Sequence, residues 1–211
     1  MTMSFIGDSD DADTHIPAPW PQLIPLLHFR RGHLICLGVP ADDEARLSAA
    51  LADHAQAHGE RTLLYPTSPA AHELGARRVL RSRLTAQHIV DDAESFASTR
   101  RPVDLIVVED FSKLCAPDGE RLREPEEIDD AGRRLKRLAD DLTVFLMVPV
   151  DRTPPAAEPM RLSDLGLGAE LVYHADVLAL LERTSPGNAD VLVVKDRFGP
   201  VPYKASIPWE S

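Results

Sequence analysis

Apolar residues in this chain form short continuous runs that alternate with stretches of helical spacing, an arrangement typical of an α/β protein. The strongest run is Val103–Glu109 (VDLIVVE), which predicts a parallel strand buried on both faces. The clearest helical pattern is Pro125–Asp141, with apolar residues every three or four positions. Acids precede bases along that stretch, in agreement with the helix dipole. The chain is therefore expected to fold around a buried parallel sheet.

The other predicted elements keep this alternation and end in antiparallel strands. We expect helices from the residues after Asp43 to about His58, at Ala70–Leu84 and at Asp91–Thr99. A loop at Gly38–Asp43 is expected between the first strand and the first helix. A turn at Ser185–Asn188 and a terminal hairpin after Phe198 close the pattern. Further strands are expected at His33–Leu37, Arg61–Tyr65, Gln87–Val90, Thr143–Val148, Ala175–Leu181, Asp190–Lys195 and Tyr203–Ile207.

Residues 1–25 differ from the rest of the chain. An acidic cluster is followed by four prolines around Trp20, and such proline spacing opposes a helix. We expect a disordered tail or an extended arm here, and a single domain over residues 26–211. Phe5, Ile6, Trp20 and Leu23 are apolar enough to anchor the arm, either on a neighbouring molecule or on its own domain.

The net charge of −11 argues against broad adhesion to nucleic acid or to an anionic membrane. No apolar run is long enough for a transmembrane helix, and no signal peptide is recognisable, so a cytoplasmic protein without a membrane partner is expected. Cys36 and Cys115 are predicted to be isolated buried thiols. A local basic patch remains compatible with this charge. Its candidates lie on one expected helix, and a solvated helix face is the simpler interpretation: Arg77, Arg78, Arg81 and Arg83.

Three segments carry a resemblance to a known family. Met160–Arg183 (MRLSDLGLGAELVYHADVLALLER) is similar to an "LSDL…G…ADVV…L.R" motif, and Val193–Ile207 (VVKDRFGPVPYKASI) to a "KNRNGPTG" hairpin. LIVVEDFSKL resembles a strand that ends in a metal-supporting acid, with Asp110 as the match beside Glu109. In this order they resemble the RecA-like ATPase core of DnaB-type replicative hexameric helicases. That resemblance implies a RecA-like three-layer α/β sandwich: a mostly parallel twisted sheet, helices on both faces and a C-terminal antiparallel hairpin.

The departures from that family fall on the reacting groups. Its phosphate loop, G-x-P-x-x-G-K-[ST], aligns on Gly38–Ala45 (GVPADDEA). Gly38 and Pro40 are kept, whereas Asp43 replaces the second glycine, Glu44 the lysine and Ala45 the magnesium-binding hydroxyl. Thr67-Ser68-Pro69 stands in place of the catalytic glutamate, and Val148-Pro149 in place of a sensor pair.

Acids at the start of the first helix would repel a polyphosphate, because like charges 4 Å apart repel by about 4 kcal/mol at an effective dielectric near 20. A simpler role for Asp42, Asp43 and Glu44 is to complement the helix N-terminus. Without the hydroxyl partner, Glu109 and Asp110 are expected to be ordinary solvated or hydrogen-bonded carboxylates. We therefore expect a degenerate phosphate loop, no catalytic residues, no cofactor and no ATP hydrolysis.

In the resembled family, the positions of Lys195 and Arg197 reach the nucleotide of a neighbouring subunit. A guanidinium works in this way without a nucleotide site of its own; an ordinary exposed hairpin is the competing interpretation. The sequence thus favours a pseudo-ATPase that assembles with itself or with an intact RecA-like ATPase. A residual ATP-binding protein and an adaptor for single-stranded nucleic acid remain as alternatives. His54 and His58 have a zinc-compatible spacing, but no third ligand is identifiable.

Overall fold

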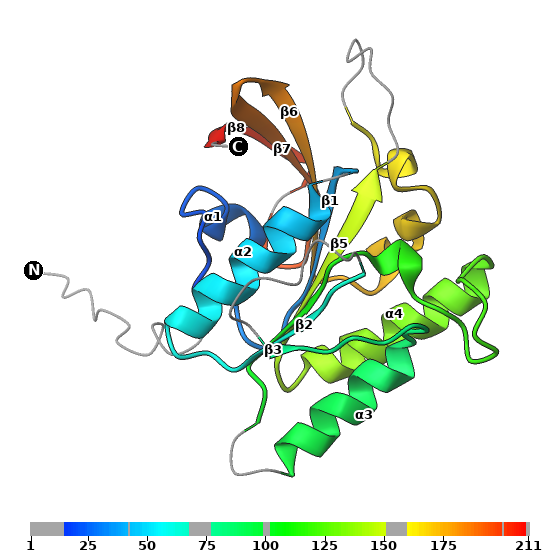
Figure 1. Ribbon diagram of the computed structural model, residues 1–211. Coiled ribbons are helices and arrows are strands. Elements are labelled where there is room, and N and C mark those ends of the chain that lie inside the picture. Colours follow the sequence, from blue (N-terminus) through cyan, green and yellow to red (C-terminus); the bar gives the residue numbers. More distant parts are fainter. Residues whose placement is uncertain are drawn as a thin grey trace, which may run out of the picture.

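The computed structural model describes residues 15–41, 43–67, 77–98, 102–150, 160–199 and 201–209. One eight-stranded sheet has the strand order β3-β2-β4-β5-β1-β6-β7-β8, with helices on both of its faces (Figure 1). The elements in chain order are α1 (Ile24–Leu27), β1 (Leu34–Pro40), α2 (Glu44–Ala57), β2 (Thr62–Tyr65), β3 (Arg77–Arg78), α3 (Ala86–Ala97), β4 (Leu105–Val108), η3 (Phe111–Lys113), α4 (Pro125–Ala139), β5 (Thr143–Val150), η4 (Leu162–Tyr173), β6 (Val177–Ser185), β7 (Gly187–Asp196) and β8 (Tyr203–Trp209), where η marks a 3-10 helix.

The strands from β3 to β6 are parallel, and β7 and β8 continue the sheet in antiparallel fashion. Strand β1 lies between β5 and β6, with Leu34 in register with Val144 and Ile35 in register with Val177. Strands β1 and β5 are buried at every residue but one, as expected for strands covered on both faces. The predicted fold class, a mostly parallel sandwich with a C-terminal antiparallel hairpin, is confirmed.

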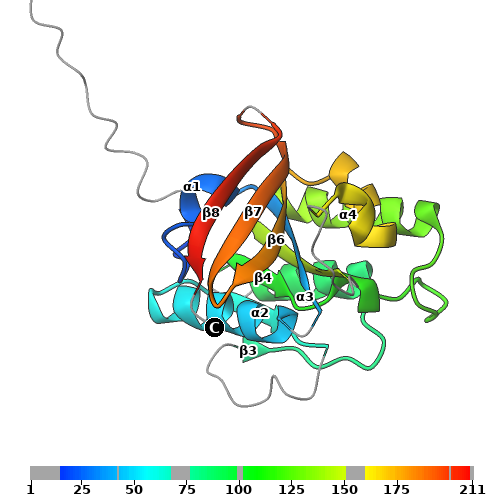
Figure 2. The ribbon, with the colours of Figure 1, turned by 90° about the horizontal axis from the view of Figure 1, so that it is seen from above.

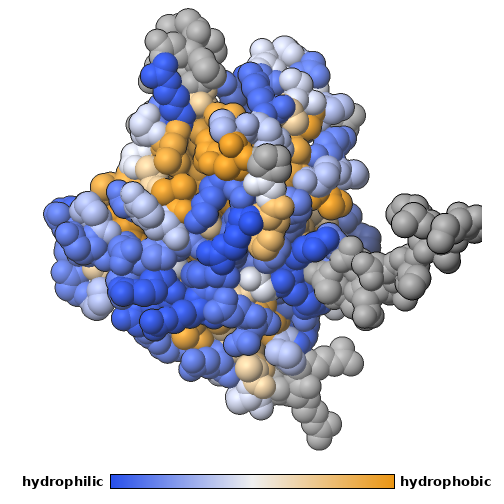
Figure 3. Space-filling model, turned by 180° about the vertical axis from the view of Figure 1, so that it is seen from behind, coloured by the Kyte–Doolittle hydropathy of each residue, from blue (hydrophilic) through white to orange (hydrophobic). Residues whose placement is uncertain are grey.

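Two hydrophobic clusters hold the layers together. One packs α2 and the segment from Ile16 to Phe29 against one face of the sheet, and the other packs α3, α4 and η4 against the opposite face. Figure 2 shows β8 at the outer edge of the sheet, next to α1. Seen from behind, apolar side chains gather in the upper part of an otherwise largely hydrophilic surface (Figure 3).

The described part of the predicted tail packs on this chain's own domain. Ile16 and Leu23 are fully buried, and the ring of Trp20 stacks against that of Trp209 with centroids 6.0 Å apart. Phe5 and Ile6 lie outside the described residues, so their anchoring role stays a prediction. The arm was expected to pack either on a neighbouring molecule or on its own domain. Residues 15–25 pack on their own domain.

Two local predictions are wrong. Gln87–Val90 is not a strand but part of α3, whose N-cap Thr85 accepts a hydrogen bond from the His88 amide at 3.1 Å. The predicted helix at Ala70–Leu84 fails over its described part, because residues 77–78 form the edge strand β3 and residues 79–84 are not helical. Residues 70–76 lie outside the described residues.

Candidate functional site

The β1–α2 junction stands where the resemblance places a phosphate loop, and it is short. The predicted loop from Gly38 is wrong at its start, because Gly38, Val39 and Pro40 belong to β1 and pair with β5. Only residues 41–43 connect the strand to α2. The Asp43 amide donates to the Pro40 carbonyl at 3.1 Å, which closes this connection as a tight turn. Asp42 lies outside the described residues.

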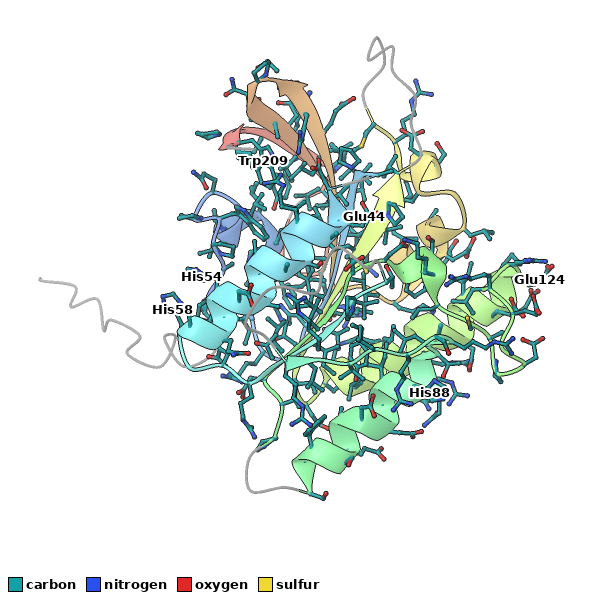
Figure 4. All side chains as sticks on the ribbon, viewed as in Figure 1. Glu44, His54, His58, His88, Glu124 and Trp209 are labelled. Atoms are coloured by element: carbon teal, nitrogen blue, oxygen red, sulfur yellow. The ribbon has the colours of Figure 1, made fainter. Side chains whose placement is uncertain are left out.

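An ion pair within the chain lies beside the N-terminal end of α2. Asp43 is the N-cap residue, and its carboxylate pairs with the Arg183 guanidinium from β6. Arg46 approaches the same oxygen, with 3.5 Å between Nη2 and Oδ1. Glu44 opens the helix at the same end (Figure 4). The Asp43 side chain accepts no hydrogen bond from the amides of α2, so the ion pair lies beside the helix end at which amides hold phosphate oxygens in other proteins.

The space beside Gly38 is closed by apolar side chains. A methyl group at this position would lie 2.6 Å from Cδ2 of Leu165 and 2.7 Å from Cδ2 of Leu180. Leu165 belongs to η4, within the segment that resembles the helicase motif, and Leu180 lies on β6. Glycine is therefore required here for packing, because any side chain would collide with that layer.

The end of β4 carries two buried acids that are bonded differently. Asp110 accepts hydrogen bonds from the Ser112 amide at 2.9 Å and the Ser112 hydroxyl at 2.6 Å, and Lys113 Nζ lies 3.1 Å from it. Asp110 thus caps η3, as expected for a hydrogen-bonded carboxylate. Glu109 is fully buried, and its Oε1 accepts from the Thr67 hydroxyl at 3.1 Å. Within the described part of the chain, Glu109 Oε2 has no hydrogen-bond partner.

Lys195 and Arg197 lie at the end of β7, which is beside the start of β1 and so at the opposite end of the strands from the β1–α2 junction. The Lys195 ammonium donates to the carbonyl of Val172 in η4. Burial lowers the pKa of this ammonium, and the nearby Arg197 guanidinium lowers it further. Arg197 Nη1 pairs with Asp176 Oδ1 at 2.8 Å, although about half of the arginine side chain remains exposed. Both groups are held at one place on the surface.

Asp176 bonds to groups from several elements at this end of the strands. It is almost completely buried, and its Oδ2 accepts from the Leu34 amide at 2.8 Å and lies 2.9 Å from Lys136 Nζ. The backbone groups of Asp176 and Leu34 also pair at 2.8 Å. Asp176 lies in the segment that resembles the helicase motif, but its partners could not be predicted from the sequence. They come from β1, α4 and the end of β7, which are separate elements of the chain.

The four arginines of the predicted basic patch do not share a helix. The Arg77 guanidinium lies over the Phe96 ring, 4.1 Å from its centroid. Arg81 pairs with Asp92 at 2.6 Å. The side chain of Arg83 packs over Gly119. The guanidinium nitrogens of Arg78 are buried, and within the described chain they have no hydrogen-bond partner. These side chains therefore do not form one solvated, phosphate-tracking row.

No metal site is found among the described residues, where His, Cys, Asp and Glu form no cluster of three or more. His54 and His58 lie together near the end of α2, with ring centroids 4.2 Å apart (Figure 4). The prediction of two buried, unpaired thiols at Cys36 and Cys115 is confirmed. Within the described ranges, every helix is too short or too polar to cross a membrane.

Comparison with known proteins identifies the fold. No protein-family model matches the sequence, and no curated protein matches it. The solved ATPase domain of G40P superposes with a TM-score of 0.72 and 14% identity, over 94% of this chain and 90% of that one. The solved structure of a DnaB-like replicative helicase and its interactions with primase gives a TM-score of 0.74 and 13% identity, over 93% of this chain and 61% of that one. The fold predicted from the three sequence segments is therefore confirmed: this chain has the fold of the ATPase domains of DnaB-like helicases.

Proposed function

We propose that this protein is a pseudo-ATPase: a RecA-like subunit that binds no nucleotide and serves an intact RecA-like ATPase beside it. The observation that carries the proposal is the Asp43–Arg183 pair at the N-terminal end of α2. A fold alone does not confer an activity when the groups that perform it are missing. An assembly or regulatory role is what remains for such a subunit.

The residues at the β1–α2 junction do not fit a nucleoside triphosphate. A phosphate there needs backbone donors and a cation, whereas Asp43 and Glu44 present carboxylates. Arg183 is already paired, and Ala45 has no oxygen with which to hold magnesium. The short connection over residues 41–43 leaves no loop to wrap around phosphates, so no step of ATP hydrolysis is assigned to this chain.

We propose further that Arg197, supported by Lys195, acts on the nucleotide of the neighbouring ATPase. About half of the Arg197 side chain is exposed, and its ion pair with Asp176 holds one terminal nitrogen, Nη1, of the guanidinium. An arginine supplied in trans stabilises transition-state charge during phosphoryl transfer. The helicase-like position of this hairpin supports the role.

The test is the ATPase rate of an intact DnaB-type helicase from the same genome, measured with and without this protein. The wild-type chain is expected to raise that rate, and Arg197→Ala is expected to abolish the increase while leaving the fold intact. Arg133→Ala, at another exposed arginine, is the matched control. An Arg197→Ala protein that stimulates as well as the wild type would refute the trans role.

Two alternatives have their own tests. Residual nucleotide binding is favoured by Glu109, whose buried Oε2 lacks a partner in the described chain and would accept a cation. Direct titration with nucleotide decides it. A nucleic-acid adaptor would bind single-stranded DNA in a salt-dependent way and lose that binding on Arg77→Glu or Arg81→Glu. The contacts of these arginines with Phe96 and Asp92 disfavour the adaptor. A cytoplasmic location stays a prediction.

A further inference from the structure

Two histidines at the end of α2 form a pair that the proposed function does not use. The imidazole rings of His54 and His58 lie with their centroids 4.2 Å apart and their planes inclined by 35° (Figure 4). The chain around them is open, since Gln56, Ala57, His58 and Gly59 are exposed. A Cβ added to Gly59 would meet no heavy atom within 4 Å. We call His54 and His58 the histidine pair, and another molecule can reach it from solvent.

Helical geometry places both rings on one side of α2. Two positions four residues apart in a helix lie one above the other on the same face. His58 is the C-cap residue, but its amide still donates to the His54 carbonyl at 3.2 Å, which is the regular helical hydrogen bond. Two histidines at this spacing on one helix face bind zinc in other proteins. The histidine pair therefore offers two nitrogen ligands from a single helix.

A hydrogen bond also decides which nitrogen of His58 is free. Its Nδ1 lies 2.8 Å from the carbonyl oxygen of His54. A carbonyl oxygen only accepts hydrogen bonds, so Nδ1 carries the proton and is the donor. The lone pair of the neutral ring then lies on Nε2, at the tip of the side chain. Histidines that bind metal ions usually donate their second ring nitrogen to a carbonyl or carboxylate in this way, which fixes the ring for its ligand.

The charges around the histidine pair are compatible with a bound cation. Asp53 directly precedes the pair, and Glu60 follows it by two positions. The basic groups in this region are already paired with carboxylates: Arg31 lies 2.6 Å from both Glu60 and Asp104, and Arg61 Nε lies 3.7 Å from Asp104. Three carboxylates against two guanidinium groups leave a net negative charge. No excess of positive charge therefore opposes a divalent ion here.

One chain supplies only half of a zinc site. Structural zinc sites are tetrahedral and have four protein ligands. Among the described residues, no third histidine, cysteine, aspartate or glutamate joins the histidine pair in a cluster. The same pair on a second copy would provide the two missing nitrogens, and the exposed small residues Ala57 and Gly59 leave room for a second helix end to approach. Two chains that each carry a net charge of −11 repel each other, and a divalent ion between them offsets that repulsion.

We propose that the histidine pair binds Zn²⁺ together with the histidine pair of a second copy, so that one metal ion joins two chains at the ends of their α2 helices. Four imidazole nitrogens form a tetrahedral set, which Zn²⁺ accepts because its filled d shell imposes no other geometry. The ion exchanges bound water for imidazole, and a neutral imidazole has no proton to lose on binding. The site uses none of the residues that we assign to the neighbouring ATPase, so the two proposals can fail independently.

The test titrates the untagged protein with ZnCl₂ at about pH 7.5, above the ordinary histidine pKa. Calorimetry is expected to give one Zn²⁺ per two chains. Light scattering is expected to show the mass doubling with zinc and returning to that of a single chain with EDTA. His54→Asn and His58→Asn are each expected to abolish the zinc-dependent dimer and to weaken zinc binding by at least about tenfold, since even loss of a group that supports a ligand has this effect. Gln56→Ala, between the two histidines, is the matched control and is expected to behave like the wild type.

A second measurement uses Co²⁺ in place of Zn²⁺, because the visible absorption of Co²⁺ differs between tetrahedral and octahedral coordination. Strong tetrahedral absorption that is lost in either asparagine variant supports a site of four imidazoles. Weak octahedral absorption on a single chain would show two histidines with water as the remaining ligands, and would overturn the shared site. A mass that responds neither to zinc nor to EDTA, or zinc binding that both asparagine variants retain, would also overturn it. None of these results affects the proposed function, which is tested on Arg197.

Discussion

At the scale of single residues, Asp176 shows how a motif residue supports both fold and surface. Its carboxylate accepts a hydrogen bond from the Leu34 amide and forms ion pairs with Lys136 and Arg197, so it joins β1, α4 and the end of β7. A buried carboxylate is tolerated because these donors satisfy it. Any substitution of Asp176 also removes the ion pair that holds Arg197, the arginine that we propose acts on the neighbouring ATPase.

Replacing Asp176 by alanine is expected to lower the free energy of unfolding by about 3–5 kcal/mol, because it takes the acceptor from the buried Leu34 amide and from the largely buried Lys136 ammonium. Urea denaturation at neutral pH measures this. Asp130→Ala is the control: Asp130 pairs with Arg133 and Arg134 on the exposed face of α4, where ion pairs contribute about 0–1 kcal/mol. Equal losses for the two variants would contradict this account of Asp176.

His33, at the same end of the strands, makes the stability of the protein depend on pH. Burial lowers the pKa of its imidazole, against a smaller opposing effect from the hydrogen bond with the His28 carbonyl. The unfolded chain therefore takes up this proton at a higher pH than the folded chain does. Stability is unaffected above about pH 6.5, the ordinary histidine value, and falls as the pH drops from there toward the folded-state pKa.

We expect the His33→Asn protein to lose less stability than the wild type between about pH 6.5 and 5.5, the range just below the ordinary histidine pKa. Denaturant midpoints measured across that range give the two slopes. The pKa of His54 is also lowered by burial, so His54→Asn tests whether the effect is specific to the buried edge. Parallel slopes for wild type and His33→Asn would contradict the assignment.

At the scale of elements, the proposed function rests on the β1–α2 junction. Strand β1 continues through Gly38 to Pro40, and the layer formed by Leu165 and Leu180 covers that extension. The turn into α2 is then too short to form a cradle. Leu165 belongs to η4, which lies within the segment that resembles the helicase motif.

Gly38→Ala is expected to destabilise the protein by about 1–3 kcal/mol, the usual cost of overpacking. The added methyl group would lie 2.6 Å from Leu165 and 2.7 Å from Leu180, both well packed. Combining it with Leu165→Ala should make the cost of Gly38→Ala smaller than in the wild-type background, because part of the collision is removed. Thermal unfolding of the four proteins measures this. An unchanged cost in the double variant would contradict the packing account.

Elements with a strong apolar pattern could be predicted from sequence, and those set by partners could not. The runs at β4 and β5 and the periodicity of α4 placed these elements to within a few residues. The strand predicted at Gln87–Val90 failed because four apolar or neutral residues suit a helix start equally well. Its capping box uses His88 in place of the usual Glu or Gln.

The candidate site divides in the same way. Replacement of the phosphate-loop residues is visible in the sequence, since it depends on residue type at fixed spacing. The Asp43–Arg183 pair is not, because its partners lie 140 positions apart.

At the scale of the whole molecule, the two ends of the sheet have different tasks. The end of the strands next to α2 carries the Asp43–Arg183 ion pair, whereas the opposite end, beside the end of β7, carries half-exposed Arg197 and Phe198. The segment from Ile16 to Phe29 packs under β6–β8 and joins the last strand through Trp20 and Trp209.

The most direct test of the central claim is isothermal titration of the purified protein with ATP and Mg²⁺. An intact DnaB-type ATPase domain titrated in parallel serves as the positive control. The account predicts no saturable heat for this protein at millimolar nucleotide, because Asp43, Glu44 and Arg183 leave no phosphate site at α2. Saturable binding with a submillimolar Kd, lost when Glu109 is replaced by glutamine, would contradict it.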